Sequence, residues 1–251
     1  MSERKVVAII QARMGSTRLP GKVLEPIQSA PMLCWVVDRT RLARSIDEAI
    51  IATTIERADE AIVELCEQED YLCYRGSPGD VLDRYWQAAN LHEAEVIVRI
   101  TADCPLIDPG LIDDAVETLL TSEPPLDFVA NRLPWERTYP IGLDVEVCTA
   151  RVLGIAWRDA EEKHQREHVM PFIYEHPNRF RTLLLNAEDD YGALRWTVDT
   201  IEDLMFVRQV VKELPGQFDF NWHDVLNIVE ANPELAEINA NVEHRTHHDV
   251  E

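Results

Sequence analysis

Short apolar runs alternate with amphipathic stretches along the first two-thirds of the chain. The runs are rich in β-branched residues and apolar on both faces, which is the pattern of strands in a parallel sheet covered by helices. They predict strands at residues 5–11, 48–53, 71–74 and 95–100. The stretches between them predict helices at residues 32–44, 58–69 and 81–93, with Asp80 suited to cap the last one.

The alternation is less regular after a helix predicted at residues 109–120. Further strands are predicted at 128–130, 144–147 and 181–185, and further helices at 150–163, 167–175, 201–214 and 222–231. Together these elements indicate an α/β fold of three layers, in which helices cover a doubly wound, mostly parallel sheet. Since no flexible linker or internal repeat interrupts the chain, we expect one domain over residues 1–251. Residues 125–147 are predicted to form an inserted hairpin or loop, and residues 232–251 a polar C-terminal tail.

The charge of the chain is strongly negative and unevenly distributed. Lys and Arg number 24 against 46 Asp and Glu, so the net charge is −22, which argues against a nucleic-acid or membrane-surface partner. The composition, with 46% hydrophobic and 28% charged residues, is that of an ordinary folded protein. The first 22 residues, however, hold five Lys and Arg against one acidic residue, a local charge of +4.

The cysteines and the N-terminus indicate a cellular location. The five cysteines are odd in number and contain no C-x-x-C pair, so they predict neither a disulfide framework nor a cysteine zinc site. The first apolar run stops at Gln11 without a cleavage site, so we expect no signal peptide, and no run reaches membrane-spanning length. We therefore expect a cytoplasmic protein.

The strongest chemical signal follows the first predicted strand. The loop reads Q-A-R-M-G-S-T-R-L-P-G-K at residues 11–22, and such a loop lies at the carboxyl edge of a parallel sheet, where α/β proteins bind ligands. Two glycines allow close backbone approach, while Arg13, Arg18 and Lys22 supply cations for phosphate oxygens. The glycine spacing fits neither a Walker A loop nor a Rossmann fingerprint. The alternative is a solvated basic loop, which a chain already at −22 does not need for solubility.

Two aspartates stand at comparable positions later in the chain. Asp103 follows the fourth predicted strand, and Asp199 follows a short apolar stretch before a helix. Beside a bound polyphosphate, such carboxylates are suited to hold Mg²⁺. The alternative interpretation is that Asp103 closes its loop and that Asp199 or Thr200 caps the following helix.

The motifs described above resemble those of a known family. The segment I-I-Q-A-R-M-G-S-T-R-L-P-G-K at residues 9–22 is similar to the nucleotide-binding signature of the cytidylyltransferases. These include the synthetases of CMP-3-deoxy-manno-octulosonate and CMP-acylneuraminate, and especially their spore-coat-polysaccharide-type relatives. The resemblance continues through residues 75–85, 99–108, 139–146, 166–169 and 195–203. It implies the Rossmann-like fold of the nucleotide-diphospho-sugar transferases.

The resemblance also implies roles for individual residues. Lys22, Arg13 and Asp103 would act in catalysis, and Asp103 and Asp199 would bind the metal. Octulosonate-activating relatives carry Gln-Gly-Asp where this chain has Thr101-Ala102-Asp103, which argues against octulosonate as the acceptor. The residues implied for CTP are Ala12, Arg13, Ser16, Arg18, Lys22, Thr53, Arg75 and Thr101.

The acceptor is predicted to bind where residues 131–146 form a loop over the sheet edge, close to several basic residues. Arg195 or Arg166 could pair with a carboxylate or phosphate of the acceptor. Each candidate could instead belong to a surface salt bridge. The acceptor candidates are Arg132, Arg137, Tyr139, Gly142, Asp144, Arg166, His168 and Arg195.

A competing motif is H-x-x-E-H, formed by His164, Glu167 and His168, which is the pattern of a zinc hydrolase. It would need a third ligand, for which Glu175 and His176 are candidates. The motif overlaps the segment at residues 166–169 that already belongs to the cytidylyltransferase resemblance.

These observations predict a Mg²⁺-dependent cytidylyltransferase that transfers CMP from CTP to an acidic sugar or related polysaccharide precursor and releases pyrophosphate. The expected partners are CTP, one or two Mg²⁺ ions and a small anionic acceptor, with no nucleic acid and no membrane. The resemblance also implies a homodimer, for which residues 131–146 could be an arm. The alternatives are a nucleotide-sugar-binding protein on the same fold without transfer activity, and the zinc hydrolase.

Overall fold

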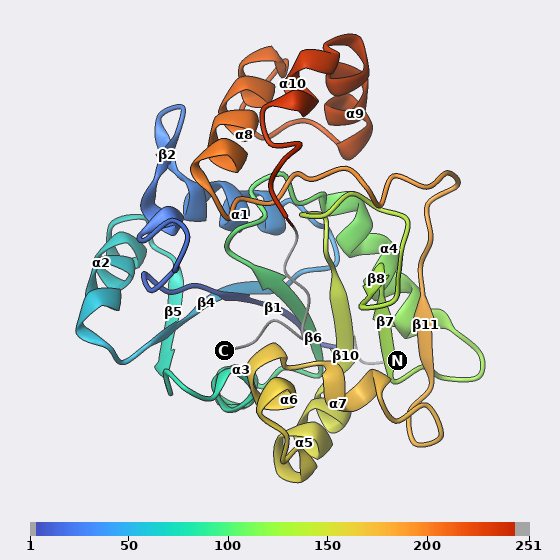
Figure 1. Cartoon of the computed structure of the whole chain (residues 1–251). Helices are drawn as coiled ribbons and strands as arrows, with labels where there is room; N and C mark the ends of the chain where they lie inside the picture. Colours follow the sequence, from blue (N-terminus) through green and yellow to red (C-terminus); the bar gives the residue numbers. More distant parts are fainter. Residues whose placement is uncertain (1–3, 244–251) are drawn as a thin grey trace.

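Seven strands form one sheet through the middle of the molecule (Figure 1). A computed structural model describes residues 4–243. The strand order is β11-β7-β10-β6-β1-β4-β5, and β10 alone among these strands runs antiparallel to its neighbours. The strands are β1 (Val6–Gln11), β4 (Glu48–Thr54), β5 (Leu72–Gly76), β6 (Val96–Thr101), β7 (Phe128–Ala130), β10 (Glu146–Thr149) and β11 (Thr182–Leu184).

Helices cover both faces of the sheet, which confirms the predicted fold class. Along β1, Val6, Ala8 and Ile10 join one hydrophobic core and Val7 and Ile9 join the other. The first core is completed by α1 (Met32–Arg41), α2 (Glu60–Gln68), α4 (Pro109–Thr121), α8 (Ile201–Glu213) and α9 (Trp222–Ala231). The second is completed by α3 (Val81–Leu91), α5 (Ala150–Asp159) and α7 (Pro171–Tyr174), with α6 (Lys163–His168) packed on α3.

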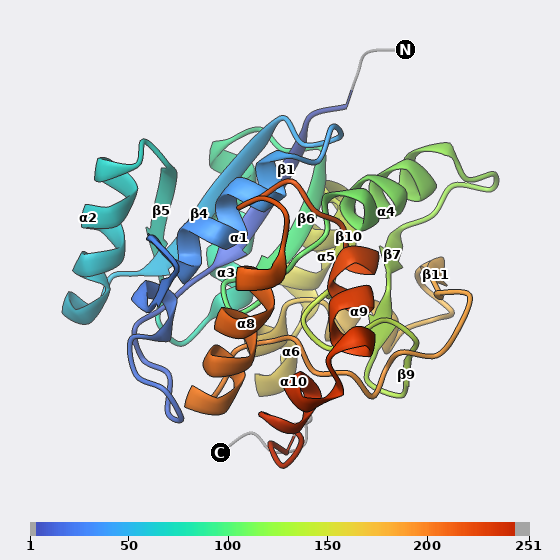
Figure 2. The same cartoon turned by 90° about the horizontal axis from the view of Figure 1, so that it is seen from above.

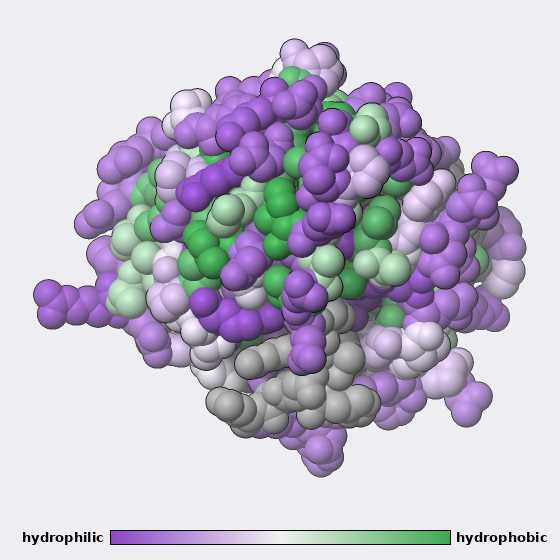
Figure 3. Space-filling view, turned by 45° about the horizontal axis from the view of Figure 1, so that its top comes forward, coloured by the Kyte–Doolittle hydropathy of each residue, from purple (hydrophilic) through white to green (hydrophobic). Residues whose placement is uncertain are grey.

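Short elements complete the part of the chain that the structure describes. The helix α10 (Pro233–Glu237) contacts α8 and α9, and Figure 2 shows these three together. Hydrophilic residues cover most of the face in Figure 3, as expected for an acidic chain, and apolar residues gather in a smaller central area. No helix between residues 4 and 243 is long and apolar enough to cross a membrane. The remaining elements are η1 (Lys22–Leu24), β2 (Pro26–Ile27), β3 (Ala30–Pro31), η2 (Arg57–Asp59), β8 (Arg132–Leu133) and β9 (Glu136–Arg137).

Side-chain caps fix where several helices begin. Asp80 accepts a hydrogen bond from Asp83 N at 2.9 Å, so the predicted cap of α3 is present. Asp108 caps α4 in the same way, and Pro109 follows at the first helical position, where its missing N–H costs nothing. The Asp108 cap fixes the start of α4 directly after the loop that carries Asp103.

The predicted helices at 150–163 and 167–175 are wrong in their boundaries. The chain turns to an extended conformation at Ala160, so α5 ends at Asp159 and α6 begins separately at Lys163. Val169 then has a φ of +72°, which ends α6 at His168, and Pro171 begins α7. Apolar periodicity could not show these breaks because α6 and α7, the helices on either side of Val169, have only six and four residues. The strand predicted at 144–147 begins two residues later, at Glu146.

Two segments predicted as peripheral are partly built into the fold. The strand predicted at 128–130 is present as β7 in the seven-stranded sheet, and within residues 125–147 the hairpin consists of β8 and β9. Residues 232–243, predicted as part of a polar tail, include the helix α10, which contacts α8 and α9, and the buried Asn239, which is only 5% exposed. Its side chain is satisfied inside the protein because Nδ2 donates to Arg195 O and Asp203 Oδ1, both at 3.0 Å. The clustered histidines lie outside the described residues.

A close backbone contact joins the loop before β10 to the segment before α8. Ile141 N donates to Leu194 O at 2.8 Å, and Trp196 N donates to Ile141 O at 2.7 Å. Gly142 follows with a φ of +109°, and a Cβ at this position would lie 2.5 Å from Thr197 N. Only glycine fits here, so Gly142, predicted on the acceptor side, has a structural role in bringing these segments together.

We expect Gly142→Ala to lower the free energy of unfolding by about 2–4 kcal/mol, because the added methyl group meets backbone atoms at an unfavourable φ. Urea unfolding measures the change. Gly79→Ala is the matched control, because Gly79 has no positive φ and no atom within 4 Å of the added Cβ. Equal unfolding midpoints for the two variants would show that the contact at Gly142 is not tight.

Candidate active site

A cavity of about 250 Å³ opens where the loop after β1 meets the loop after β6 and the start of α8. The carboxyl ends of β1 and β6 lie side by side, with Gln11 and Thr101 as register partners. Eight of the predicted nucleotide and metal residues therefore meet around one space. The cavity is lined by Gln11, Ala12, Arg13, Gly15, Ser16, Thr17, Arg18, Lys22, Val23, Thr101, Ala102, Asp103 and Asp199.

The shape of the basic loop is fixed by backbone hydrogen bonds around Met14. Ser16 N and Gly21 N both donate to Met14 O, at 2.9 and 3.0 Å, and Gly21 allows this turn with a φ of +74°. Met14 N in turn donates to Asp59 Oδ1 at 2.7 Å. Asp59 is 2% exposed and also accepts a hydrogen bond from the Thr54 hydroxyl. Asp59 therefore anchors the loop, a role that the sequence alone did not reveal.

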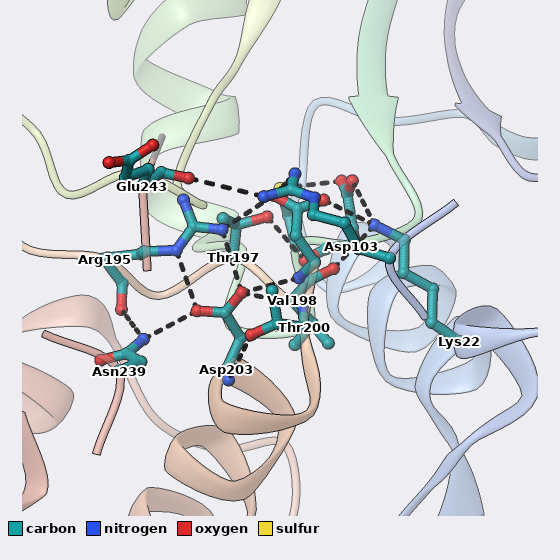
Figure 4. Close-up of polar contacts among 12 residues, drawn as sticks. Lys22, Asp103, Arg195, Thr197, Val198, Thr200, Asp203, Asn239 and Glu243 are labelled. Carbon is teal, nitrogen blue, oxygen red and sulfur yellow. Dashed lines mark hydrogen bonds and ion pairs between the residues drawn. The ribbon is translucent and has the colours of Figure 1, made fainter. Parts of the chain in front are cut away.

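Lys22 joins the two aspartates of the site, and Figure 4 shows its side chain pointing toward Asp103. Its Nζ donates to Asp103 Oδ2 at 3.0 Å, to Asp199 Oδ1 at 2.9 Å and to Val198 O at 2.7 Å. The residue is 8% exposed. Burial alone would lower the pKa of Lys22, but the two carboxylates outweigh it and raise the pKa above its ordinary value. The side chain is therefore held as a charged ammonium.

The backbone brings the two aspartates to this ammonium. Val198 N donates to Asp103 O at 2.8 Å, and Thr197 Oγ1 donates to the same oxygen at 3.1 Å. The segment before α8 is thus fastened to the loop after β6. This pairing places Asp103 and Asp199 on the same cation although 96 positions separate them in the sequence.

Three cations surround Asp199. In addition to Lys22, Arg18 and Arg195 approach Asp199 Oδ2 to 2.9 and 2.8 Å. Burial would raise the pKa of Asp199, but these cations hold it well below its usual range. Arg195 also makes two 2.9 Å hydrogen bonds to the fully buried Asp203. This placement points to Arg195 as a residue that holds Asp199, and it gives no support to the predicted contact of Arg195 with the acceptor.

The two aspartates have the chemistry of a Mg²⁺ site. One oxygen of each lies within 3.0 Å of Lys22 Nζ, so hard carboxylate ligands converge on one point. Between residues 4 and 243 no group of three or more His, Cys, Asp or Glu side chains is arranged to hold a metal. A cation here would complete its shell with water and phosphate oxygens, which is how Mg²⁺ is commonly bound.

The zinc-hydrolase alternative finds no support in the structure. His164 Nε2 lies 2.7 Å from Glu175 Oε1, and Gln165 Nε2 donates to the other oxygen of Glu175 at 2.8 Å. His176 Nδ1 lies 2.7 Å from Phe172 O. The histidine and glutamate side chains of H-x-x-E-H are not among any metal-holding group in the described part of the chain.

Thr53 and Arg75, implied to lie near the base and ribose, do not line this cavity. They are register partners on β4 and β5, on the other side of β1 from β6. Thr53 is fully buried. The Arg75 guanidinium makes a 2.7 Å ion pair with Glu60 and a 3.1 Å hydrogen bond to Thr54 O. Their role in nucleotide binding stays a prediction.

Three of the acceptor candidates form one cluster next to β10. Arg137 makes hydrogen bonds of 2.5 and 3.0 Å to the two oxygens of Asp144, and Arg132 Nε lies 3.4 Å from Asp144 Oδ2. Burial would raise the pKa of Asp144, but Arg137 and Arg132 outweigh it and lower the pKa. With two guanidinium groups and one carboxylate, the cluster keeps a net positive charge.

The other acceptor candidates are dispersed. Tyr139 packs against Trp222 with ring centroids 5.5 Å apart and lines a separate cavity of about 440 Å³ beside α4. Arg166 Nε donates to Asp80 at 3.0 Å, and Nη1 donates to Trp157 O at 2.6 Å, so this side chain ties α6 to the start of α3. His168 is the last residue of α6. The structure therefore does not bring the predicted acceptor residues into one group.

Gln11, Arg99 and Glu146 form a buried polar group that the sequence analysis missed. Arg99 pairs with Glu146 across the β6–β10 register, and its Nη2 donates to Gln11 Oε1 at 3.2 Å. A guanidinium can only donate, so the Gln11 oxygen faces Arg99, and Gln11 is at the same time one of the residues that line the cavity. Charged residues within otherwise apolar strand runs were the available signal.

Comparison with known proteins decides the family. The chain matches the family described as Cytidylyltransferase over residues 7–231. The chain belongs to the cytidylyltransferase family. It is 38% identical over 252 residues to an uncharacterized protein of Methanocaldococcus jannaschii, covering 98% of this chain and 99% of that protein. It is 32% identical over 238 residues to the spore coat polysaccharide biosynthesis protein SpsF of Bacillus subtilis, covering 92% of this chain and 96% of that protein.

A solved structure agrees with this assignment. A cytidylyltransferase from Leptospira borgpetersenii has a TM-score of 0.89 and 31% identity, covering 96% of this chain and 100% of that chain. The predicted family, fold class and enzyme class are thus confirmed, and this cytidylyltransferase is a nucleotidyltransferase that uses CTP.

We expect Asp59→Ala to raise the dissociation constant for CTP by about tenfold, because Met14 N–H loses its buried acceptor and the loop loses its anchor. Isothermal calorimetry measures the change. Glu64→Ala, an exposed change on the neighbouring α2, is the control and should leave CTP affinity unaltered. Unchanged CTP affinity in a folded Asp59→Ala protein would mean that this anchor does not shape the nucleotide site.

Proposed function

We propose that this cytidylyltransferase transfers CMP from CTP to an acidic sugar or a related polysaccharide precursor in a Mg²⁺-dependent reaction that releases pyrophosphate. The observation that carries the proposal is the meeting of the basic loop with Asp103 and Asp199 around one cavity at the carboxyl ends of β1 and β6. The position of SpsF in spore coat polysaccharide biosynthesis supports a polysaccharide precursor as the acceptor class.

The triphosphate would lie along the loop after β1. Arg13 is exposed, whereas Arg18 and Lys22 reach toward Asp199 from the same cavity wall. Backbone N–H groups of a glycine-containing loop and these cations match the oxygens of a polyphosphate. As the bond from the α-phosphorus to pyrophosphate breaks, negative charge grows on the leaving group, and the cations already in place stabilise it.

Asp103 and Asp199 would hold Mg²⁺ against the nucleotide. The bound ion would neutralise phosphate charge and lower the pKa of the attacking acceptor group. The chain itself holds the two carboxylates next to each other, because Val198 N and Thr197 Oγ1 both donate hydrogen bonds to Asp103 O. An acceptor oxygen in line with the α-phosphorus then forms the new P–O bond as pyrophosphate departs.

The β6–β10 side of the sheet is the side we assign to the acceptor. Gln11 on β1 accepts a hydrogen bond from Arg99 on β6 and lines the cavity. The positively charged cluster of Arg132, Arg137 and Asp144 lies beside β10 and suits an anionic group. A cytoplasmic location and a homodimer complete the proposal, on the sequence grounds given above.

The test is pyrophosphate release from CTP and Mg²⁺ with a panel of 2-keto acid sugars. Because each change removes charge from the reacting centre, we expect Asp103→Ala and Lys22→Ala to lower turnover by about 100-fold or more. Lys212→Ala and Asp219→Ala, both exposed and outside the site, are matched controls that should retain activity.

Wild-type turnover in either site variant would contradict the mechanism. Uptake of CTP without pyrophosphate release, whatever the acceptor, would instead identify a nucleotide-binding protein without transfer activity.

A further inference from the structure

The hydrogen-bonding capacity of Lys22 is fully used in this structure. An ammonium group has three N–H donors. The three acceptors are Asp103 Oδ2, Asp199 Oδ1 and Val198 O, all within 3.0 Å of Nζ. Lys22 therefore has no donor left for a phosphate oxygen. At least one of these bonds must break before Lys22 can contact a nucleotide.

The charges around this ammonium are balanced without a divalent cation. Lys22, Arg18 and Arg195 make ion pairs with Asp199, and Lys22 and Arg195 also pair with Asp103 and Asp203. Three cations thus face three carboxylates. A divalent cation added beside Asp103 and Asp199 with Lys22 in place would meet a buried ammonium at hydrogen-bond distance from the same oxygens, and the like charges would repel each other.

We propose that Lys22 Nζ and the catalytic divalent cation compete for Asp103 and Asp199, so that the metal binds tightly only together with a nucleotide whose phosphates accept the displaced ammonium. The proposal rests on the Mg²⁺ requirement in the proposed function. It assigns Lys22 two successive partners: the carboxylates in the free enzyme and the triphosphate in the loaded one.

The geometry allows this exchange with little movement. Lys22 is the first residue of η1 and lines the cavity together with Arg13, Ser16 and Arg18. A phosphate held by this loop lies within reach of a side chain with four rotatable bonds, and Val198 O can continue to accept from Nζ. In the free enzyme the ammonium keeps the two carboxylates at the right separation and prevents them from repelling each other or trapping a metal ion.

The test is to titrate the nucleotide-free protein with Mn²⁺ and to measure the concentration of the unbound ion at each step by electron paramagnetic resonance. We expect weak binding to the wild type, and we expect Lys22→Met to increase Mn²⁺ affinity by about tenfold or more, because two adjacent carboxylates are left without their cation. The double variant Lys22→Met with Asp103→Asn should lose this gain. Lys212→Met, which removes an exposed lysine on α8, should behave as the wild type.

Two results would overturn the proposal. One is Lys22→Met protein that binds Mn²⁺ no more tightly than the wild type. The other is wild-type protein that binds one Mn²⁺ ion tightly without nucleotide and loses it on Asp103→Asn, a result that holds even if Lys22→Met does not fold. Failure of the proposed function would look different, because pyrophosphate release would then continue when Mg²⁺ is removed by a chelator.

Discussion

The ion pairs of Lys22 with Asp103 and Asp199 are the interaction on which the arrangement of the site depends. They join the loop after β1, the loop after β6 and the segment before α8, which the sequence separates widely. Lys22 is buried, and in the free enzyme both carboxylates and the Val198 carbonyl compensate its charge. The same contacts that balance a buried charge therefore define where a nucleotide and a metal would meet.

Two residues that the sequence predicted on the acceptor side, Arg195 and Gly142, instead hold this arrangement in place. Arg195 is bound to Asp199 and Asp203, and Asn239 extends that network into the C-terminal segment. Gly142 permits the close approach of the loop before β10 to the segment that leads to Asp199. Removing a partner from a buried charged network leaves the other charge uncompensated, so such positions affect activity without touching a substrate.

Much of the fold could be predicted because local patterns determine it. The two-sided apolar strands and the Asp80 cap predicted the central α/β layers, whereas the break at Val169 left no trace in the periodicity. The basic loop and both aspartates were recognisable because each follows an apolar run at a sheet edge. Asp59 was not recognisable, because its role as the anchor of the basic loop depends on a hydrogen bond with Met14, 45 positions away along the chain. Gln11 likewise depends on Arg99 in another strand.

In the free enzyme, Lys22 and Asp103 stabilise the fold through each other, by the 3.0 Å ion pair between them. A double-mutant cycle with Lys22→Met and Asp103→Asn, read as free energies of unfolding in urea, tests it most directly. We expect a favourable coupling of about 1–3 kcal/mol, because each single change leaves the other charge partly uncompensated. Additive effects, with a coupling near zero, would contradict it.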